Sequence, residues 1–238
     1  LSLLAQTLDK YNISVCGLTE VRRLNSGSVI VAHPDLIHPS TLLWSGRSDV
    51  HHHGVGLLLS SHAKKCLSDW SPISPRVIRA RFITPKARLT IICIYAPTLA
   101  SPQQDHDDFY DTLDAEIARI PAHDMSIVLG DFNAHTGTAR DSFETVLGPF
   151  CHPSPRNESG RRLLDLCQRN RLVITNTFFR HRPIHRDTYT APDGHHRQLL
   201  DYILVNKRFR SSVLDTRVRR NARSFIDSDH ELVMCKVR

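Results

Sequence analysis

The chain has 238 residues, 40% of them hydrophobic, and a formal net charge of +7 from 31 Lys and Arg against 24 Asp and Glu. A chain of this size can bury one substantial core, so we expect a single domain over residues 1–238 rather than two small ones. It has no apolar run of membrane-spanning length and no signal-peptide pattern in its first residues, so we expect a cytoplasmic or nuclear protein that is not secreted and has no membrane partner.

The pattern of residues 1–100 predicts one helix followed by a series of strands. Leucines recur at helical spacing through residues 1–12, which predicts a helix there. An apolar run at 13–18 then predicts a short buried strand, which ends near Glu20. Further strands are predicted from apolar runs that are separated by loops rich in Ser, Pro and His, at 41–46, 54–60, 77–84 and 88–97.

The rest of the chain continues this alternation. A Ser-Pro start and an apolar stripe predict a helix over 101–120, and a second helix is expected at 159–171 with Leu163, Leu164 and Cys167 facing inward. Strands are expected at 126–133, 172–179, 187–191, 199–206, 213–218 and 230–237. No repeat or linker interrupts the pattern, which favours an α/β fold in which two packed sheets are flanked by helices.

The six cysteines lack the paired spacing of a metal site or a redox motif, and several lie inside apolar runs. We expect reduced thiols that serve packing, which agrees with an intracellular compartment. They are Cys16, Cys66, Cys93, Cys151, Cys167 and Cys235.

Positive charge is concentrated in the last third of the chain. Residues 1–150 contain 13 Lys and Arg against 15 Asp and Glu, whereas residues 151–238 contain 18 against 9. The excess is mostly arginine, whose planar guanidinium suits recognition of phosphate groups. The pattern fits either a well-solvated basic face or a polyanionic partner.

Acidic residues stand at or near the ends of several expected strands, namely Glu20, Asp131, Asp201 and Asp229. Strand ends in a sandwich tend to converge at one edge, where short loops hold them on a rigid frame. Carboxylates brought together repel one another unless a cation or a protonated partner offsets them. The four acids therefore indicate a divalent metal site with oxygen ligands, an acid–base site, or both.

Five motifs, taken in chain order, resemble the endonuclease/exonuclease/phosphatase superfamily: LTE at 18–20, IYAPT at 94–98, GDFN at 130–133, LLDYILV at 199–205 and SDH at 228–230. Three other segments are similar to the apurinic-type endonuclease domain of non-LTR retrotransposons and to the craniofacial-development-protein-like sequences derived from it. These are NxxGRRLLDLC at 157–167, LVITNTFF at 172–179 and TYTAPDG at 188–194. The resemblance covers nearly the whole chain.

The resemblance implies a four-layered α/β sandwich, two packed mixed β-sheets flanked by helices, that nicks DNA by Mg²⁺-dependent phosphodiester hydrolysis, with Mn²⁺ as an alternative ion. By position, Glu20 resembles the carboxylate ligand of the metal, and Asp229 resembles a residue beside it. Asp131 resembles the base that activates the attacking water, with Asn133 orienting it. Tyr95 resembles the phenol that contacts the scissile phosphate.

His230 resembles the phosphate-contacting imidazole, and Asp201 the acid that keeps this imidazole charged and oriented. Phosphodiester hydrolysis independently requires positive charge at the non-bridging oxygens, a base near water and a stabilised leaving group. A buried Asp201 next to His230 would raise the pKa of the histidine, which supports that role. Contacts to DNA are expected from Arg161, Arg162, Arg180, Arg182, Thr188, His195 and His196, the two histidines being at the tip of a hairpin.

Structural explanations compete with these roles. Asp131 and Asn133 could form an ordinary Asx turn, Asp201 could be an edge-strand carboxylate that faces solvent, and Tyr95 could be a core residue. The histidine run at 51–53 is interpreted as a solvated loop rather than a metal site, because three consecutive side chains on an extended chain cannot all face one ion.

The sequence departs from the resembled family at its start. The family begins with a strand that carries an asparagine, upstream of the first helix, and this chain starts inside that helix. We therefore expect a monomeric domain whose first strand is missing, either a fragment of a longer polypeptide that also carries a reverse transcriptase or a degenerate relative. Nicking of target DNA for retrotransposition is the leading function. The alternatives are a phosphatase of the same fold that acts on inositol phosphates or lipids, and a catalytically weak nucleic-acid-binding remnant.

Overall fold

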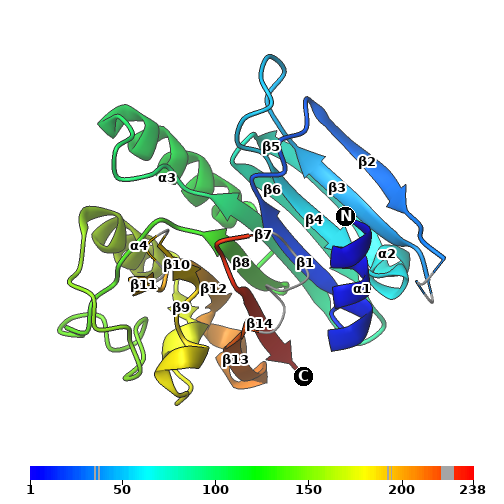
Figure 1. Ribbon diagram of the computed structural model, residues 1–238. Coiled ribbons are helices and arrows are strands. Elements are labelled where there is room, and N and C mark those ends of the chain that lie inside the picture. The colour runs from blue at the N-terminus through cyan, green and yellow to red at the C-terminus, as the bar shows by residue number, and fades with distance from the viewer. Residues whose placement is uncertain (35, 37, 192, 194, 221–227) are drawn as a thin grey trace. The chain divides into compact units, whose positions relative to one another are not determined.

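Figure 1 shows a computed structural model, which describes residues 1–34, 36, 38–191, 193, 195–220 and 228–238. The chain divides into two compact units. Unit 1 comprises Leu1–Tyr95 with Ala122–Asp124, and unit 2 comprises Ala96–Pro121 with Met125–Arg238. Each unit combines helices with sheets, so the expected α/β class is confirmed. The organisation of residues 1–238 as one domain stays a prediction.

Unit 1 begins with a helix and a four-stranded antiparallel sheet in the order β1-β4-β3-β2. Leu42 and Leu43 on β3 and Leu57 on β4 are fully buried, because these two strands are interior and apolar on both faces. The helix ends at Asn12, which adopts the left-handed conformation typical of a helix C-terminus. The elements are α1 (Ser2–Tyr11), β1 (Val15–Thr19), β2 (Ser26–Val31), β3 (Ser40–Ser45) and β4 (Val55–Leu59).

A second antiparallel sheet in unit 1 has the order β5-β6-β7. Ile78 on β6 and Ile92 and Ile94 on β7 are fully buried. Strand β4 contacts both β6 and β7, and β1 contacts β7, so the two sheets of this unit pack face to face as predicted. The elements are α2 (Ser61–Cys66), β5 (Leu67–Ser74), β6 (Val77–Ile83) and β7 (Arg88–Tyr95).

Unit 2 is built on three antiparallel strands in which β12 lies between β8 and β9. Two helices contact each other, and the second of them contacts β9. The inward residues predicted for that helix, Leu163, Leu164 and Cys167, are all fully buried. The elements are α3 (Gln103–Ala118), β8 (Met125–Asp131), α4 (Glu158–Arg169), β9 (Leu172–Ile174) and β12 (Asp201–Asn206).

Shorter elements complete unit 2 (Figure 1). A two-stranded hairpin precedes β12, and a two-stranded antiparallel ribbon follows it, with its last strand in contact with β12. The elements are η1 (Thr175–Thr177), η2 (Pro183–His185), β10 (Tyr189–Thr190), β11 (Arg197–Gln198), η3 (Lys207–Ser212), β13 (Val213–Arg219) and β14 (Leu232–Val237).

The sequence patterns missed β2, α2 and β5 and overestimated two strands. The strand predicted over 172–179 stops at Ile174, because the Thr177 hydroxyl donates to the Ile174 carbonyl at 2.7 Å and the chain turns into η1. The strand predicted over 187–191 is only Tyr189–Thr190. The sequence pattern does not predict β5 because the strand contains Pro72, and its pairing with β6 is irregular near that residue. All six cysteines are free thiols, as expected.

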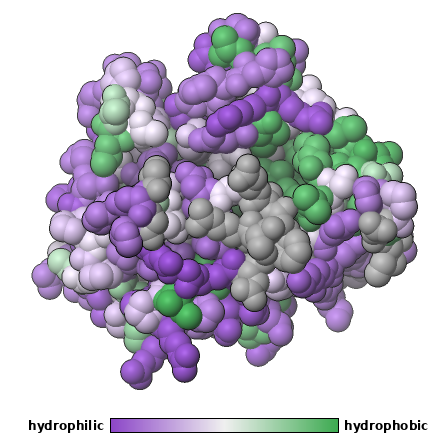
Figure 2. All heavy atoms as spheres, in the orientation of Figure 1, coloured by the Kyte–Doolittle hydropathy of each residue, from purple (hydrophilic) through white to green (hydrophobic). Residues whose placement is uncertain are grey.

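Hydrophilic side chains dominate the face shown in Figure 2, where hydrophobic ones form limited patches. One exposed apolar side chain is Ile30 on the edge strand β2, at 70% exposure, and it shares its face of the strand with the exposed Ser26 and Ser28. None of the helices in the described part of the chain is long and apolar enough to cross a membrane.

A buried ion pair in unit 1 gives the first prediction. The fully buried Asp124 accepts two hydrogen bonds from Arg81, at 2.7 and 3.1 Å, and one from Thr90 at 3.0 Å. Asp124→Ala would leave the Arg81 charge and the Thr90 hydroxyl without this partner. We expect urea unfolding to show a loss of about 3 kcal/mol in the free energy of unfolding.

Asp49→Ala is the matched control, because it removes an equally bidentate pair with Arg47, both bonds at 2.9 Å, from the solvent-exposed surface. Exposed pairs contribute up to about 1 kcal/mol. Equal losses in the two variants would contradict the importance that we give to burial of Asp124.

Candidate active site

Two of the acids predicted at strand ends lie on neighbouring strands of unit 2. Strand β8 ends at Asp131, and antiparallel pairing with β12 places Asp201 directly opposite it. Opposite residues in an antiparallel pair are close neighbours on one face of the sheet. Asp131 is 4% exposed and Asp201 is half-buried, so two partly desolvated carboxylates are held together. Such a pair requires positive charge nearby.

The chain leaves β8 through a tight turn. Gly130 has φ 140° and Asn133 has φ 47°, and glycine and asparagine are the residues that accept positive φ at least cost. The Asp131 Oδ1 accepts a hydrogen bond from the Asn133 N–H at 2.8 Å, so the Asx turn that the sequence allowed is present. The Asn133 Nδ2 donates to the Ala96 carbonyl at 2.9 Å. The turn therefore fixes the directions of both side chains.

His230 supplies the positive charge. Its Nδ1–H donates to Asp201 Oδ2 at 2.8 Å. Burial by itself lowers the pKa of His230, but the hydrogen bond to Asp201 and the charge of that carboxylate outweigh it, with smaller contributions from Asp131 and Asp229. The pKa consequently rises from 6.5 to about 9, so the imidazole is protonated at neutral pH. Because β12 is an interior strand, the edge-strand alternative for Asp201 is wrong.

The segment around β10 holds this pair in place. Tyr189 forms a bridge with His230, and their ring centroids are 5.1 Å apart. Thr188, which the sequence reading assigned to DNA contact, is fully buried instead. Its hydroxyl accepts hydrogen bonds from the backbone N–H groups of Leu200 and Asp201 at 3.0 and 3.1 Å. A side chain without exposed surface cannot reach DNA, so Thr188 is corrected to a residue that positions Asp201.

In unit 1, the structure brings Glu20 and Tyr95 together. The Tyr95 hydroxyl donates to Glu20 Oε1 at 2.9 Å, and Arg22 pairs with Glu20 Oε2 at 2.7 Å. Glu20 has φ 52°, a conformation that is uncommon for a glutamate, and its side chain stays 46% exposed. Tyr95 is 8% exposed, so its ring is largely in the core while its hydroxyl holds a polar group. One carboxylate is thus fixed with access to solvent.

Sequence reasoning missed two neighbours of Tyr95. His53 lies with its ring centroid 5.7 Å from that of Tyr95, and Arg76 donates to the Tyr95 carbonyl at 3.1 Å and contacts His53 Nε2 at 3.4 Å. Burial, aided by the charges of Arg76 and nearby residues, lowers the pKa of His53 to about 4. His53 is therefore uncharged at neutral pH. The solvated-loop interpretation holds for the exposed His51 and His52 but not for His53, and no spacing in the sequence separates these three histidines.

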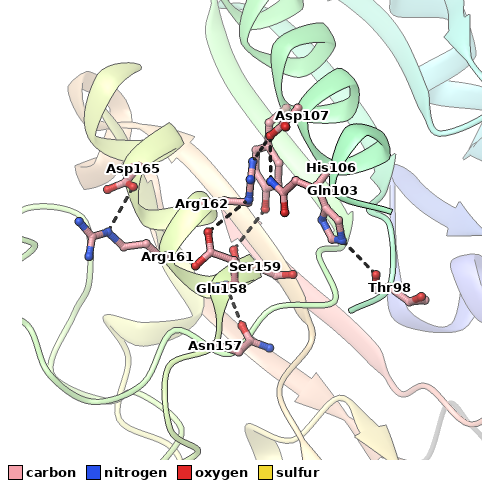
Figure 3. Close-up of polar contacts among 12 residues, drawn as sticks. Thr98, Gln103, His106, Asp107, Asn157, Glu158, Ser159, Arg161, Arg162 and Asp165 are labelled. Carbon is pink, nitrogen blue, oxygen red and sulfur yellow. Dashed lines mark hydrogen bonds and ion pairs between the residues drawn. The ribbon is translucent and has the colours of Figure 1, made fainter. Parts of the chain in front are cut away.

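The remaining predicted residues differ in their surroundings. Asp229 is exposed, and its carbonyl accepts the Thr190 N–H at 3.1 Å. Arg161 pairs with Asp165 along α4, whereas Arg162 is held by Asp107 of α3 at 2.8 Å (Figure 3). Arg162 is held in this internal pair, and its contact with DNA stays a prediction. The other four residues expected to contact DNA are exposed: Arg180, Arg182, His195 and His196.

The acids restrict how a metal ion could bind. In the described part of the chain, no group of three or more His, Cys, Asp or Glu side chains is arranged to hold a metal ion. A cage made only of protein ligands is therefore not formed by these residues. Mg²⁺ commonly takes one or two carboxylates and completes its shell with water and substrate phosphate oxygens. The half-exposed Glu20, oriented by Tyr95, fits a ligand of that kind.

The chain belongs to the endonuclease/exonuclease/phosphatase family, because the model of that family matches residues 1–230. The family that the motifs predicted is thereby confirmed. Over its full length, the chain is 31% identical to craniofacial development protein 2 of Bos taurus, and it spans 38% of the length of that protein.

Two solved structures share the fold. The endonuclease domain of TRAS1, a telomere-specific non-LTR retrotransposon, aligns with a TM-score of 0.65 and 11% identity, covering 99% of this chain and 91% of that one. The AP endonuclease LMAP from Leishmania major aligns with a TM-score of 0.67 and 15% identity, covering 100% of this chain and 82% of that one. At these identities the likeness concerns the fold alone.

The raised pKa of His230 predicts how stability depends on pH. Since the pKa of about 9 in the folded protein exceeds the ordinary 6.5, the contribution of the Asp201–His230 pair is full below pH 6.5 and is lost as the pH rises through about 9. Its upper limit is about 3 kcal/mol. In urea unfolding with a chelator present, we expect the difference between wild type and Asp201→Asn to shrink steadily between roughly pH 6 and pH 10.

Asp193→Asn serves as the control, because Asp193 pairs with His196 on the exposed hairpin, where solvent screens the interaction. Its difference from wild type should stay small over the same range. A constant difference for Asp201→Asn at every pH would show that the pair does not hold His230 charged.

Proposed function

We propose that this protein is a metal-dependent endonuclease that hydrolyses phosphodiester bonds in DNA. The observation that carries the proposal is the protonated His230, bound to Asp201, beside the buried Asp131 on the paired strand. A positively charged donor next to a carboxylate is what hydrolysis of a phosphate diester requires, since one binds the anionic phosphate and the other accepts a proton from water.

The residues of unit 2 divide the chemistry among them. Asp131, fixed by the Asx turn, takes the proton of the attacking water, and Asn133 helps to orient it. His230 donates its free Nε2–H to a phosphate oxygen, while its Nδ1–H stays on Asp201. If His230 moved onto Asp131, the two would form an ion pair and the base would be lost. The pairing of β8 with β12 holds Asp131 in place opposite Asp201, and Asp201 holds His230 through its hydrogen bond.

The residues of unit 1 supply the metal ligand. Glu20 holds Mg²⁺ or Mn²⁺, and Tyr95 keeps the Glu20 carboxylate in one orientation through its hydroxyl. When bound, the ion neutralises charge on the phosphate and stabilises the leaving oxygen. In unit 2, the exposed carboxylate of Asp229 is proposed as a further group that could take a metal ion.

DNA is the substrate that the charge distribution supports. The arginine excess falls in residues 151–238, and Arg180, Arg182, His195 and His196 are exposed there. The similar retrotransposon protein is an endonuclease domain, which supports nicking of target DNA for retrotransposition as the biological role. We further propose that a longer polypeptide, carrying a reverse transcriptase, contains this chain, and that it acts in the nucleus.

Nicking of supercoiled plasmid with Mg²⁺ tests the proposal. Asp131→Asn keeps the shape of the side chain but cannot accept the proton, so we expect the nicking rate to fall roughly 100- to 10,000-fold. Asp108→Asn, an exposed acid on α3, is the matched control and should nick like wild type. Equal nicking by Asp131→Asn and wild type would overturn the assignment.

The same preparation separates the alternatives. Release of phosphate from inositol phosphates without plasmid nicking would favour a phosphatase. Retained, salt-sensitive DNA binding without either activity would favour a nucleic-acid-binding remnant.

Metal titration tests Glu20. Removal of metal with EDTA should abolish nicking, and added Mg²⁺ should restore it. Glu20→Gln loses the charged ligand, so we expect the Mg²⁺ concentration for half-maximal rate to rise strongly. Tyr95→Phe loses only the hydroxyl that orients this ligand, so we expect the same concentration to rise roughly 10-fold. An unchanged Mg²⁺ dependence in Glu20→Gln would contradict the metal assignment.

A further inference from the structure

Asn157 stands at the N-cap of α4, and its side chain also reaches the loop that carries the proposed base. Its Oδ1 accepts the Gly160 N–H at 2.8 Å, which caps the helix, and the His135 N–H at 3.0 Å. Its own N–H donates to the His135 carbonyl at 3.2 Å. One side chain therefore satisfies the first turn of a helix and fixes the backbone two residues beyond Asn133.

Gly160 allows this contact. A Cβ at that position would lie 1.8 Å from the His135 carbonyl oxygen, which is far inside any permitted contact. The backbone of α4 consequently comes as close to the loop as it can. The sequence motif NxxG at 157–160 thus has a physical reason: Asn157 binds the loop, and Gly160 makes room for it.

Helix α4 is itself firmly held, so it can serve as a fixed support. Figure 3 shows Arg162 of α4 reaching Asp107 of α3, with an N–O distance of 2.8 Å. The buried Tyr110 of α3 donates its hydroxyl to the Ser159 carbonyl at 3.3 Å. The apolar side of α4, which includes Leu163 and Leu164, is fully buried. These contacts with α3 and with the core hold α4 in place.

The loop needs such a support because it lies outside the regular elements and its side chains must point in set directions. Asn133 and Gly137 both have positive φ, at 47° and 68°. The loop also touches the hairpin, since His135 Nε2 lies 3.3 Å from Gln198 Oε1 on β11. Gln198 pairs with Tyr189, whose ring packs on His230. Movement of His135 would thus disturb the surroundings of the base and of the imidazole.

We propose that Asn157 is a positioning residue for the reaction, which holds the loop at His135 so that Asp131 and Asn133 keep their geometry. The inference rests on the proposed nuclease function for its catalytic consequence. Its structural content, that Asn157 restrains the loop against α4, stands without that function. Small displacements of a reacting group lower the rate of the chemical step more than they weaken substrate binding.

Three substitutions test the inference. Asn157→Asp keeps the oxygen that accepts both hydrogen bonds, Asn157→Ser keeps a good helix cap but is too short to span both donors, and Asn157→Ala removes both. In plasmid nicking with Mg²⁺ we expect Asn157→Asp to have a kcat near that of wild type. In Asn157→Ser and Asn157→Ala we expect kcat to fall roughly 10- to 100-fold, with KM changed far less than kcat.

Asn170→Ala is the matched control, because Asn170 caps the other end of the same helix and donates to the Leu166 carbonyl at 3.0 Å. It should lower the thermal stability without lowering kcat. A kcat near wild type in Asn157→Ser or Asn157→Ala would overturn the inference, as would a loss in Asn157→Asp equal to that in Asn157→Ala.

Hydrogen exchange separates failure of the inference from failure of the proposed function. In wild type, the His135 amide should exchange slowly, and in Asn157→Ser and Asn157→Ala it should exchange at least tenfold faster, while the amides of β8 keep their protection. This readout applies even if wild type does not nick DNA, a result that would overturn the proposed function alone. Unchanged exchange at His135 would overturn the inference whatever the activity.

Discussion

Asp131 and Asp201 face each other across the antiparallel pair β8 and β12, and the rest of the site follows from that contact. Two carboxylates in partly desolvated positions repel, so the arrangement needs a cation that cannot leave. His230 meets the need because its Nδ1–H is bound to Asp201 and its ring is packed on Tyr189. The hydrogen bond from His230 to Asp201 and the charge of that carboxylate keep the imidazole protonated at neutral pH.

A second constraint is the way irregular backbone is supported. Two residues to which we assign a role in the chemistry lie where the chain leaves regular structure: Glu20 after β1 and Asn133 after β8 both have positive φ. Such conformations persist only where surrounding contacts hold them. Tyr95 and Arg22 hold the Glu20 side chain in unit 1, while in unit 2 the Ala96 carbonyl and the N-terminus of α4 hold the loop after β8. Reactive side chains are thus positioned by residues that do no chemistry.

Most regular elements could be predicted, because apolar periodicity reports local burial directly. The helix at α4 and the strands β4, β7 and β12 were expected close to their observed bounds. The misses have local causes, since β5 contains a proline and the strand after α4 is stopped by a threonine hydroxyl. Candidate site residues could be predicted where an acid ends an apolar strand. The burial of Thr188 and the partly buried position of His53 could not be predicted, because both depend on segments distant along the chain.

The sequence by itself determined the family and most of the helices and strands, and short motifs in it singled out Glu20, Asp131, Asp201 and His230 as candidate site residues. Only the tertiary structure decided which of these groups touch. Strand register makes Asp201 the neighbour of Asp131, and a close approach at Gly160 brings Asn157 to the loop. These contacts join residues tens of positions apart, and pairing and packing between such segments are set by the whole core rather than by any local pattern of residues.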